Sequence, residues 1–351
     1  MFRHRFFLLF VIILLSLVSA CNKKNEENLT QNDIPTISEQ GDDELSNEPV
    51  LKIKNPLTGL DMDLKYEGQR PLAVMIENEY NARPQSGLNV ADIVYEIPTE
   101  GGITRFLAIY SHEPYNEIGP VRSARPYFIE YSMEYDAIYV HYGSSPQGYE
   151  DLKKLKIHSI DGIYDTVTFW RDKSRKKPHN AYTNTANILA TSEKRGFLKE
   201  VNQEFWQFND GDNYPDDQKL DKFKITYYKN YKVGYTYDSE KKAYARSING
   251  KPHYDRPSEE TITVKNIIVQ FVNARVVDEV GRLDINTISS GKGYYISNGY
   301  ATEIKWKKES KSERTRFYDL EGEEISLNAG NTWIQLIPQW GSFSHTEEYD
   351  G

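Results

Sequence analysis

Cysteine is almost absent from this 351-residue chain, which has one, Cys21. A single thiol cannot form a disulfide within the chain, and it leaves the rest of the sequence without a cysteine-ligated zinc site or a thiolate nucleophile. The chain also lacks a His-Glu-x-x-His motif and a Gly-x-Ser-x-Gly elbow, which are typical of zinc proteases and serine hydrolases. The sequence therefore predicts no metal and no cofactor.

The chain also has no excess of positively charged residues. The chain holds 43 Lys and Arg against 52 Asp and Glu, which gives a formal net charge of −9. Non-specific binding to nucleic acid or to lipid headgroups needs a basic surface. We therefore expect no nucleic-acid partner, and we expect the charge of the protein to hold it off an anionic membrane surface.

The N-terminal apolar run, residues 6–15, is shorter than the roughly 20 residues that span a bilayer. It follows Arg3 and Arg5 and is followed by Ser19-Ala20-Cys21, an order that is typical of a secretory signal. The small pair before Cys21 resembles the bacterial lipobox, which implies lipid transfer to the Cys21 sulfur and cleavage after Ala20. An ordinary signal with an incidental cysteine is the alternative interpretation.

The membrane is thus the first predicted partner, bound through lipid on Cys21. Two or three acyl chains hold a protein on a bilayer far more firmly than one chain does, so we expect the protein on the extracytoplasmic face of the cell membrane, without residues 1–20. Residues 21–53 are polar and acidic, with too few apolar side chains for a core. They predict a disordered tether that reaches about 30 Å as a flexible coil.

Residues 54–208 have the pattern of a mixed α/β domain. Short apolar runs predict strands at 70–76, 103–110 and 137–141. Helices are predicted at 121–135, 147–156 and 186–195, and residues 89–97 have helix or strand character. Strands that alternate with helices indicate an α/β or α+β layer.

An acidic segment, residues 209–220, predicts a linker, and the pattern of secondary structure changes after it. Residues 221–351 contain successive β-prone runs with few helical stretches, so we expect a mostly β second domain and an α+β fold overall. The runs lie at 223–228, 232–237, 244–247, 267–277, 293–297, 301–307 and 331–337. Ser290-Gly291-Lys292-Gly293 resembles a phosphate loop only faintly and is interpreted as a β-turn.

Several longer stretches have an unusual composition. They are 55–60 (NPLTGL), 70–78 (RPLAVMIEN), 83–88 (RPQSGL), 91–96 (ADIVYE), 100–106 (EGGITRF), 118–125 (IGPVRSAR), 141–146 (HYGSSP), 178–182 (PHNAY), 290–293 (SGKG) and 332–334 (TWI). Together they resemble the YerB-type lipoproteins, a family defined by two successive domains of unknown function. The resemblance implies a lipid-anchored, extracytoplasmic, two-domain protein, and it implies no particular reaction.

Arginines beside glycine turns are the predicted ligand-binding residues. Arg105 lies across the Gly101-Gly102 turn from Glu100. Arg122 and Arg125 flank Ser123 at a predicted helix start, where residues three apart share one face and could converge on an anion. Arginine forks fit a carboxylate or phosphate best. In the alternative interpretation, Arg122 and Arg125 pair with Glu96, Glu100 or Glu130 and brace the fold.

Two histidines are the predicted acid–base candidates. His141 ends a predicted strand before a hydroxyl-rich loop, and His179 lies in a basic loop. An imidazole in either place could act as a general base to a water or to a serine. Each histidine is also accounted for by a hydrogen-bonded structural role.

These residues support three hypotheses. In the favoured one the protein binds peptidoglycan or another anionic wall component through a cleft with Arg105, Arg122, Ser123, Arg125 and His179. In the second it is a cell-wall hydrolase, with Glu100 and His141 as an acid–base pair. In the third it is a scaffold for other envelope proteins.

Overall fold

Buried aliphatic strands lie at the centre of the computed structural model, which describes residues 51–111, 113–201, 205–214 and 218–344. The strands predicted at 70–76 and 103–110 are β3 (Leu72–Glu77) and β5 (Ile103–Tyr110). The predicted signal, Cys21 and nearly all of the predicted tether lie outside the described residues. None of the helices within the described ranges is long and apolar enough to cross a membrane.

The N-terminal half contains the three α-helices of the described chain and nine short strands. They are β1 (Lys52–Lys54), β2 (Asp61–Asp63), β3, β4 (Ile93–Thr99), β5, α1 (Pro126–Met133), β6 (Ile138–His141), α2 (Pro146–Lys154), β7 (Ser159–Asp161), β8 (Trp170–Arg171), β9 (Ala181–Tyr182) and α3 (Thr185–Lys194), with two 3₁₀ turns, η1 (Leu64–Tyr66) and η2 (Tyr80–Ala82).

The C-terminal half is made of strands. They are β10 (Gln218–Lys219), β11 (Lys222–Tyr228), β12 (Tyr231–Asp238), β13 (Ala243–Ile248), β14 (Lys251–Pro252), β15 (Thr263–Val264), β16 (Asn266–Val272), β17 (Ala274–Val276), β18 (Leu283–Ile285), β19 (Ser290–Ser297), β20 (Tyr300–Lys307), β21 (Arg316–Tyr318), β22 (Thr332–Pro338) and β23 (Ser342–Ser344). A mixed sheet with few helices, followed by mostly antiparallel strands, confirms the predicted α+β class.

Strands of both halves form one eleven-stranded sheet, in the order β10-β20-β19-β16-β22-β4-β5-β3-β6-β7, with β21 beside β20. The halves meet where β22 pairs with β4 in parallel, from Thr332 opposite Ile93 to Gln335 opposite Glu96. Every residue of both strands is buried, as expected for strands covered on both faces. At the other end β3, β6 and β7 run parallel, so Glu77, His141 and Asp161 end them at the same edge.

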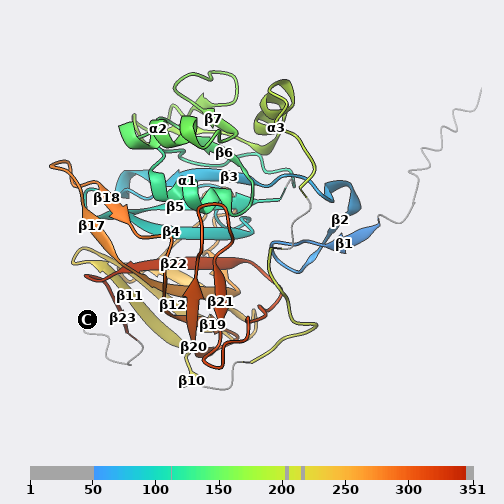
Figure 1. Ribbon diagram of the computed structural model, residues 1–351, viewed down its shortest axis with the longest axis vertical. Helices are drawn as coiled ribbons and strands as arrows, with labels where there is room; N and C mark the ends of the chain where they lie inside the picture. The colour runs from blue at the N-terminus through green and yellow to red at the C-terminus, as the bar shows by residue number, and fades with distance from the viewer. Residues whose placement is uncertain (1–50, 112, 202–204, 215–217, 345–351) are drawn as a thin grey trace, which may run out of the picture. The chain divides into compact units, whose positions relative to one another are not determined.

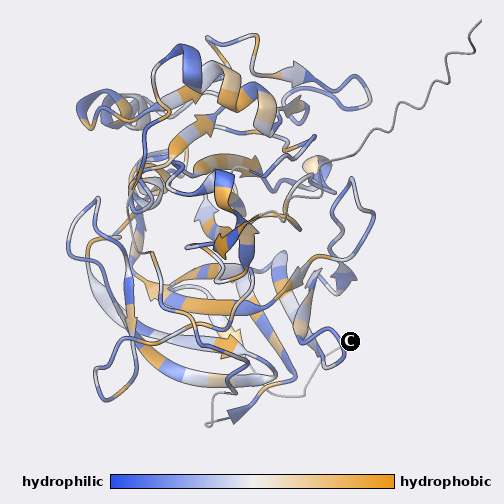
Figure 2. Ribbon diagram, turned by 90° about the vertical axis from the view of Figure 1, so that its right-hand side faces the viewer, coloured by the Kyte–Doolittle hydropathy of each residue, from blue (hydrophilic) through white to orange (hydrophobic). Residues whose placement is uncertain are grey.

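A second sheet of six strands, β14-β13-β12-β11-β23 with β15 beside β13, covers one face of the main sheet. Helix α1 packs on the other face (Figure 1). Strand β11 alternates buried and more exposed residues, with Phe223, Ile225 and Tyr227 inward, because successive side chains of a strand point to opposite faces. Hydrophobic residues accordingly gather in the layered strands, and the loops are mostly hydrophilic (Figure 2).

A buried polar network joins the two sheets. The Glu96 carboxylate lies 2.7 Å from Nη2 of Arg246 on β13, and both side chains are fully buried. Tyr231 and Thr104 donate to the same carboxylate at 2.6 and 2.8 Å. Glu96 was a predicted partner of Arg122 or Arg125, and it instead lies on the opposite face of the main sheet from them, because it points toward the second sheet.

Helix α1 begins later than predicted. Residues 121–135 were expected to be helical, but Arg125 is extended, with φ −139° and ψ 155°, and the helix begins at Pro126. A residue before proline is disfavoured in the helical region. In addition, Val121 bridges to Ile76 of β3, so residues 121–125 continue the sheet. The prediction that Arg122 and Arg125 share one helix face is therefore wrong.

The prediction of a β-turn at Ser290–Gly293 is also wrong. These residues begin β19 and pair with β20, with Gly293 opposite Ile304. A Cβ on Gly293 would lie 2.2 Å from the carbonyl oxygen of Val269. The glycine is therefore needed for close approach to the neighbouring strand β16 rather than for a turn.

Candidate functional site

The candidate site lies at the edge where β3, β6 and β7 end. Residues 121–124 cross this edge between β3 and β6. The Arg122 amide donates to Met75 O, and its carbonyl accepts from the Tyr142 amide, each at 2.9 Å. The carboxyl edge of parallel strands is where ligands of open α/β sheets bind, because the loops that follow the strands converge there.

Four side chains form what we call the Glu77 cluster: Glu77, Glu79, Arg122 and His179. The Glu77 carboxylate, 2% exposed, lies 2.9 Å from Nε of Arg122 and 3.0 Å from Nδ1 of His179. The second ring nitrogen of His179 lies 3.6 Å from the Glu79 carboxylate. One buried carboxylate therefore holds a guanidinium and an imidazole side by side.

The loop that carries His179 is tied down at several points. Asn180 Nδ2 donates to the carbonyls of Asp172 and Arg175, both at 3.1 Å. Arg175 donates to the carbonyls of Ala82 and Pro84, at 2.5 and 2.6 Å. Because these bonds fix both the loop and the segment after Glu79, the His179 imidazole is held in position before any ligand arrives.

Three groups of the Glu77 cluster are partly exposed. The side chains of Arg122, His179 and Glu79 are 28%, 18% and 31% exposed. Nε of Arg122 is buried and lies against the Glu77 carboxylate as an ion pair without a hydrogen bond. Within the described ranges neither Nη atom makes a hydrogen bond to another residue. The two Nη groups are therefore available as donors to a carboxylate or phosphate, which a guanidinium can bind in a bidentate manner.

The Glu100 cluster, formed by Glu100, Arg105 and Arg125, lies beside the first. Arg105 on β5 is the register partner of Glu77 on β3. Its Nη2 lies 3.2 Å from the Glu100 carboxylate. Nε of Arg125 donates to the same carboxylate at 3.1 Å, and its Nη2 makes a second, closer contact. Arg125 thus forms one of the ion pairs named in the bracing alternative.

Glu100 is held ionised. Burial favours the neutral acid, but the hydrogen bond from Arg125 and the charges of Arg105 and Arg125 outweigh it and hold the pKa of Glu100 at about 2. The side chain follows β4 at a hairpin tip, where Gly101 and Gly102 take φ values of +83° and +70° that favour glycine. A carboxylic acid with this pKa has no proton to donate at neutral pH.

His141 is enclosed in the core. Its side chain has no exposed surface, Nδ1 lies 2.9 Å from Gly143 O, and Nε2 has no partner within the described chain. Burial lowers its pKa. Neither member of the predicted Glu100–His141 pair is therefore placed for acid–base chemistry on a ligand from solvent. Ser123 Oγ donates to Tyr142 O at 3.0 Å, and its carbonyl accepts from Arg105.

Two residues of the cluster, Glu77 and Glu79, were not predicted from the sequence to belong to a site. Arg122 was expected to pair with Glu96, Glu100 or Glu130, and its partner is Glu77. The available signal was a carboxylate directly after the apolar run 72–76, because strand ends and the loops after them are where sites are built.

A cavity of about 590 Å³ opens next to the Glu100 cluster, between α1, α2 and the β17–β18 hairpin. Arg125 and Ser145 line it on one side and Arg282 and Leu283 on the other. Its volume is in the range of small-molecule sites. The Arg125 guanidinium is held by Glu100, and Arg282 is held by Asp278 at 2.7 Å, so the lining is not a row of free arginines.

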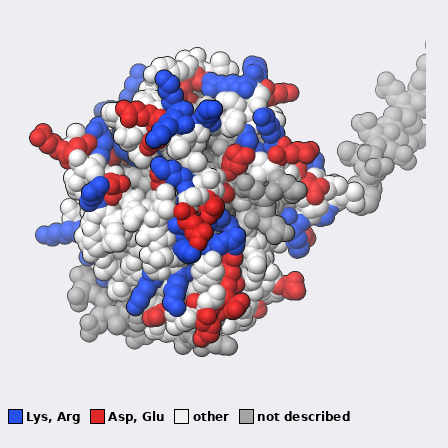
Figure 3. Space-filling view, viewed as in Figure 1, with Lys and Arg blue, Asp and Glu red and all other residues white. Residues whose placement is uncertain are grey.

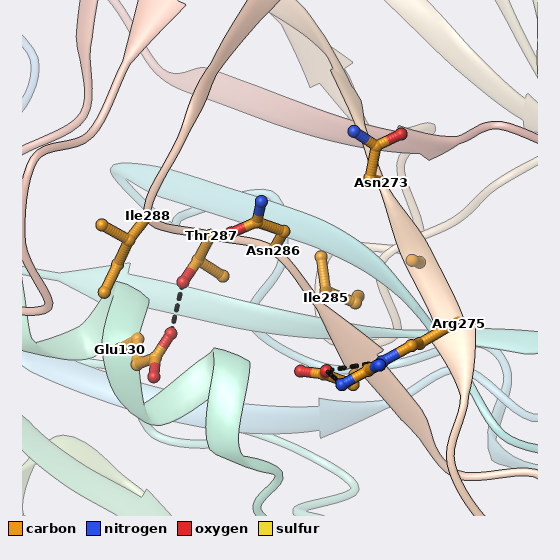
Figure 4. A pocket seen from close by; sticks show the side chains of 9 residues that line it. Glu130, Asn273, Arg275, Ile285, Asn286, Thr287 and Ile288 are labelled. Atoms are coloured by element: carbon orange, nitrogen blue, oxygen red, sulfur yellow. Dashed lines mark hydrogen bonds and ion pairs between the residues drawn. The ribbon is translucent and has the colours of Figure 1, made fainter.

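A second cavity, of about 530 Å³, lies along the same hairpin and shares Glu130, Asp284 and Ile285 with the first. Figure 4 shows Glu130 of α1 accepting a hydrogen bond from Thr287. Arg275, which also lines this cavity, donates to Asp284 at 3.0 Å. Lys and Arg are interspersed with Asp and Glu over the face drawn in Figure 3. An anion on this face would therefore be bound by local donors rather than by a broad basic patch. Within the described ranges no group of three or more His, Cys, Asp or Glu could hold a metal ion.

Comparisons with known proteins extend over both halves of the chain. The N-terminal and C-terminal domain models of a family described as "Protein of unknown function (DUF3048)" match residues 57–198 and 223–334. A protein of Bacillus subtilis (strain 168) with the name "Putative lipoprotein YerB" is 35% identical over 292 residues, which are 82% of this chain and 87% of the relative. The crystal structure of the YerB protein from Bacillus subtilis is also similar, with a TM-score of 0.75 and 35% identity, over 84% of this chain and all of that one. These matches confirm the resemblance inferred from the motifs.

Proposed function

The chain belongs to the DUF3048 family, and from that premise we propose that it is a membrane-anchored lipoprotein that binds an anionic component of the cell envelope at Arg122. The observation that carries the binding role is the partly exposed guanidinium of Arg122, whose Nε lies against buried Glu77 and whose Nη groups make no hydrogen bond within the described chain. The family description names no activity, so the ligand is argued from the site alone.

The anchor rests on two supports. A relative that matches most of the chain has the name "Putative lipoprotein YerB", and Cys21 follows a signal-like segment with small residues before it. Acyl chains on this sulfur would keep the protein on the extracytoplasmic face of the membrane, because two chains suffice for stable anchoring.

The anchor predicts a loss of membrane attachment when Cys21 becomes Ser. The wild-type protein should carry labelled palmitate and sediment with membranes, whereas the variant should be unlabelled and mostly soluble, since no acyl chain can be attached. A Cys21→Ala variant serves as a second form without the thiol. Undiminished labelling of both variants would contradict the anchor.

The charges of the two clusters favour Arg122 as the anion-binding residue over Arg105 and Arg125. Those two arginines share the Glu100 carboxylate and are only 6% and 10% exposed. An incoming anion would have to displace Glu100 from both. Arg122 needs no such exchange, because its Nη atoms make no hydrogen bond to a residue of the described chain.

The Arg122→Ala variant is expected to bind purified wall fragments about tenfold or more weakly than the wild type. A hydrogen-bonded charge contributes about 1.5–3 kcal/mol to an interaction, and tenfold in affinity is about 1.4 kcal/mol. The measurement is co-sedimentation of the full-length protein, in detergent micelles, with wall fragments at several protein concentrations.

Arg275→Ala is the matched control, because Arg275 is an exposed arginine, 77% accessible, paired with Asp284 on the β17–β18 hairpin. It removes the same charge and should leave wall binding unchanged. Equal binding by the wild type and Arg122→Ala, or equal losses in both variants, would contradict a specific anion site. Capture of protein partners with no wall binding would instead favour the scaffold hypothesis.

A further inference from the structure

The His179 imidazole is arranged like a general base. Nδ1 lies 3.0 Å from the Glu77 carboxylate, which accepts hydrogen bonds, so in the neutral ring the hydrogen belongs on Nδ1 and the lone pair on Nε2. Nε2 is 3.6 Å from the Glu79 carboxylate, too far for a hydrogen bond. The ring is partly exposed, so a water can reach Nε2. A base oriented by a buried carboxylate is the recurring element of hydrolytic sites.

The donor fork of Arg122 lies beside this base. Each oxygen of the Glu77 carboxylate contacts one of these side chains: Oε1 lies against Nε of Arg122, and Oε2 lies against Nδ1 of His179. Because one carboxylate anchors both side chains, a small anionic group on the Nη atoms of Arg122 is within reach of a water on His179. Binding and proton transfer would then act on the same group.

We propose that the Glu77 cluster hydrolyses phosphodiesters, an inference that rests on the anion site proposed for Arg122. In a phosphodiester the charged oxygens and the reacting phosphorus belong to one group, which fits a fork and a base on the same anchor. A carboxylate bound to Arg122 has no ester bond at its charged group that the water could hydrolyse. Glu79, 31% exposed beside Nε2, repels a second negative charge, so the site favours a diester monoanion over a monoester dianion.

The reaction needs only the diester and water. The water oxygen attacks phosphorus while its proton passes to Nε2 of His179, and the bond from phosphorus to one ester oxygen breaks. That ester oxygen lies opposite the attacking water, so it takes a proton from solvent and leaves as an alcohol; a phosphomonoester remains, and His179 returns its proton to solvent. His179 is the catalytic base, Arg122 binds the non-bridging oxygens, and Glu77 is a positioning residue.

The test uses bis(p-nitrophenyl) phosphate with the full-length protein in detergent micelles. The wild type should release p-nitrophenolate, and His179→Gln should lower kcat about 100-fold or more with little change in KM, as for loss of a general base. Arg122→Ala should chiefly raise KM. His158→Gln is the matched control, because His158 packs against Phe197 outside both clusters, and it should turn over like the wild type.

Two further variants separate the roles of the carboxylates. Glu77→Gln should lower kcat, because the imidazole loses the carboxylate that orients it, and Glu77→Asp, which keeps the charge, should restore part of the rate; a bracing role would lower only the protein's stability. Glu79→Gln should raise the rate on p-nitrophenyl phosphate relative to the diester, because the like charge is gone.

The outcomes distinguish the two proposals. Wall binding that depends on Arg122, with no p-nitrophenolate release by the wild type, overturns the hydrolysis and leaves the binding role standing. Release that is equal in the wild type and His179→Gln also overturns it. Turnover that depends on His179, without binding to wall fragments, supports the hydrolysis and overturns the wall component as the bound ligand.

Discussion

Replacing Glu96 by Ala is expected to lower the free energy of unfolding by about 3–5 kcal/mol, the cost of removing one partner of a buried ion pair. The Arg246 guanidinium would remain fully buried without its carboxylate. It would keep only the faces of Phe106 and Trp333, 5.5 and 4.7 Å from its centre, and contacts to neutral groups. The measurement is urea unfolding followed by tryptophan fluorescence at neutral pH.

The exposed pair Arg275–Asp284 provides the comparison. Its side chains are 77% and 53% accessible, so Asp284→Ala should change the free energy of unfolding by less than about 1 kcal/mol. A loss of similar size in both variants would show that the burial of Glu96 does not determine the cost. The comparison also tests the architecture, because Glu96 and Arg246 join the main sheet to the second sheet.

The strands and the fold class could be predicted because their signal is local. The run 103–110 was expected to be a strand and is β5, and the helix expected at 147–156 is α2, from Pro146 to Lys154. In α2 the Ser145 side chain accepts from the Gly148 amide at 3.1 Å, a local capping arrangement. β-branched runs, prolines and caps act within a few residues, so their pattern is visible in the sequence.

Pairing between distant segments could not be predicted in this way. Residues 121–125 have a composition compatible with a helix, but Val121 pairs with Ile76 and the Arg122 amide bonds to Met75. These contacts span more than 40 residues, and no local pattern shows them. The single sheet formed by both halves could not be predicted for the same reason, because β22 pairs with β4 across about 240 residues.

The candidate site was predicted in part for the same reason. Arg122 and His179 were singled out by residue type and loop position, and the structure brings them together. The group that joins them, Glu77, is one of many carboxylates in an acidic chain, and its burial depends on segments far away in sequence. Glu100 and His141 were singled out in the same manner, and their surroundings give them no exposed proton-transfer role.

The Glu100 cluster predicts the second large effect, a dependence of stability on acid pH. Since its surroundings depress the pKa of Glu100 from 4.5 to about 2, the folded state favours the ionised carboxylate more than the unfolded chain does. This stabilisation is fully present above pH 4.5 and is lost as the pH falls toward 2. Allowing for partial exposure of the site, it is on the order of 2–3 kcal/mol.

Glu100→Gln should therefore be less stable than the wild type by about 2–3 kcal/mol at pH 7, because Arg105 and Arg125 lose their shared partner. The difference should shrink as the pH falls from 4.5 to 2, where the wild-type carboxylate also becomes neutral. Urea unfolding of both proteins at several pH values measures it, with the exposed Glu240→Gln as control. A stability difference that does not change with pH would show that the charge of Glu100 does not stabilise the fold. Arg105 and Arg125 would then not be held by an ion pair with Glu100, and the reason for preferring Arg122 to them as the anion-binding residue would be lost.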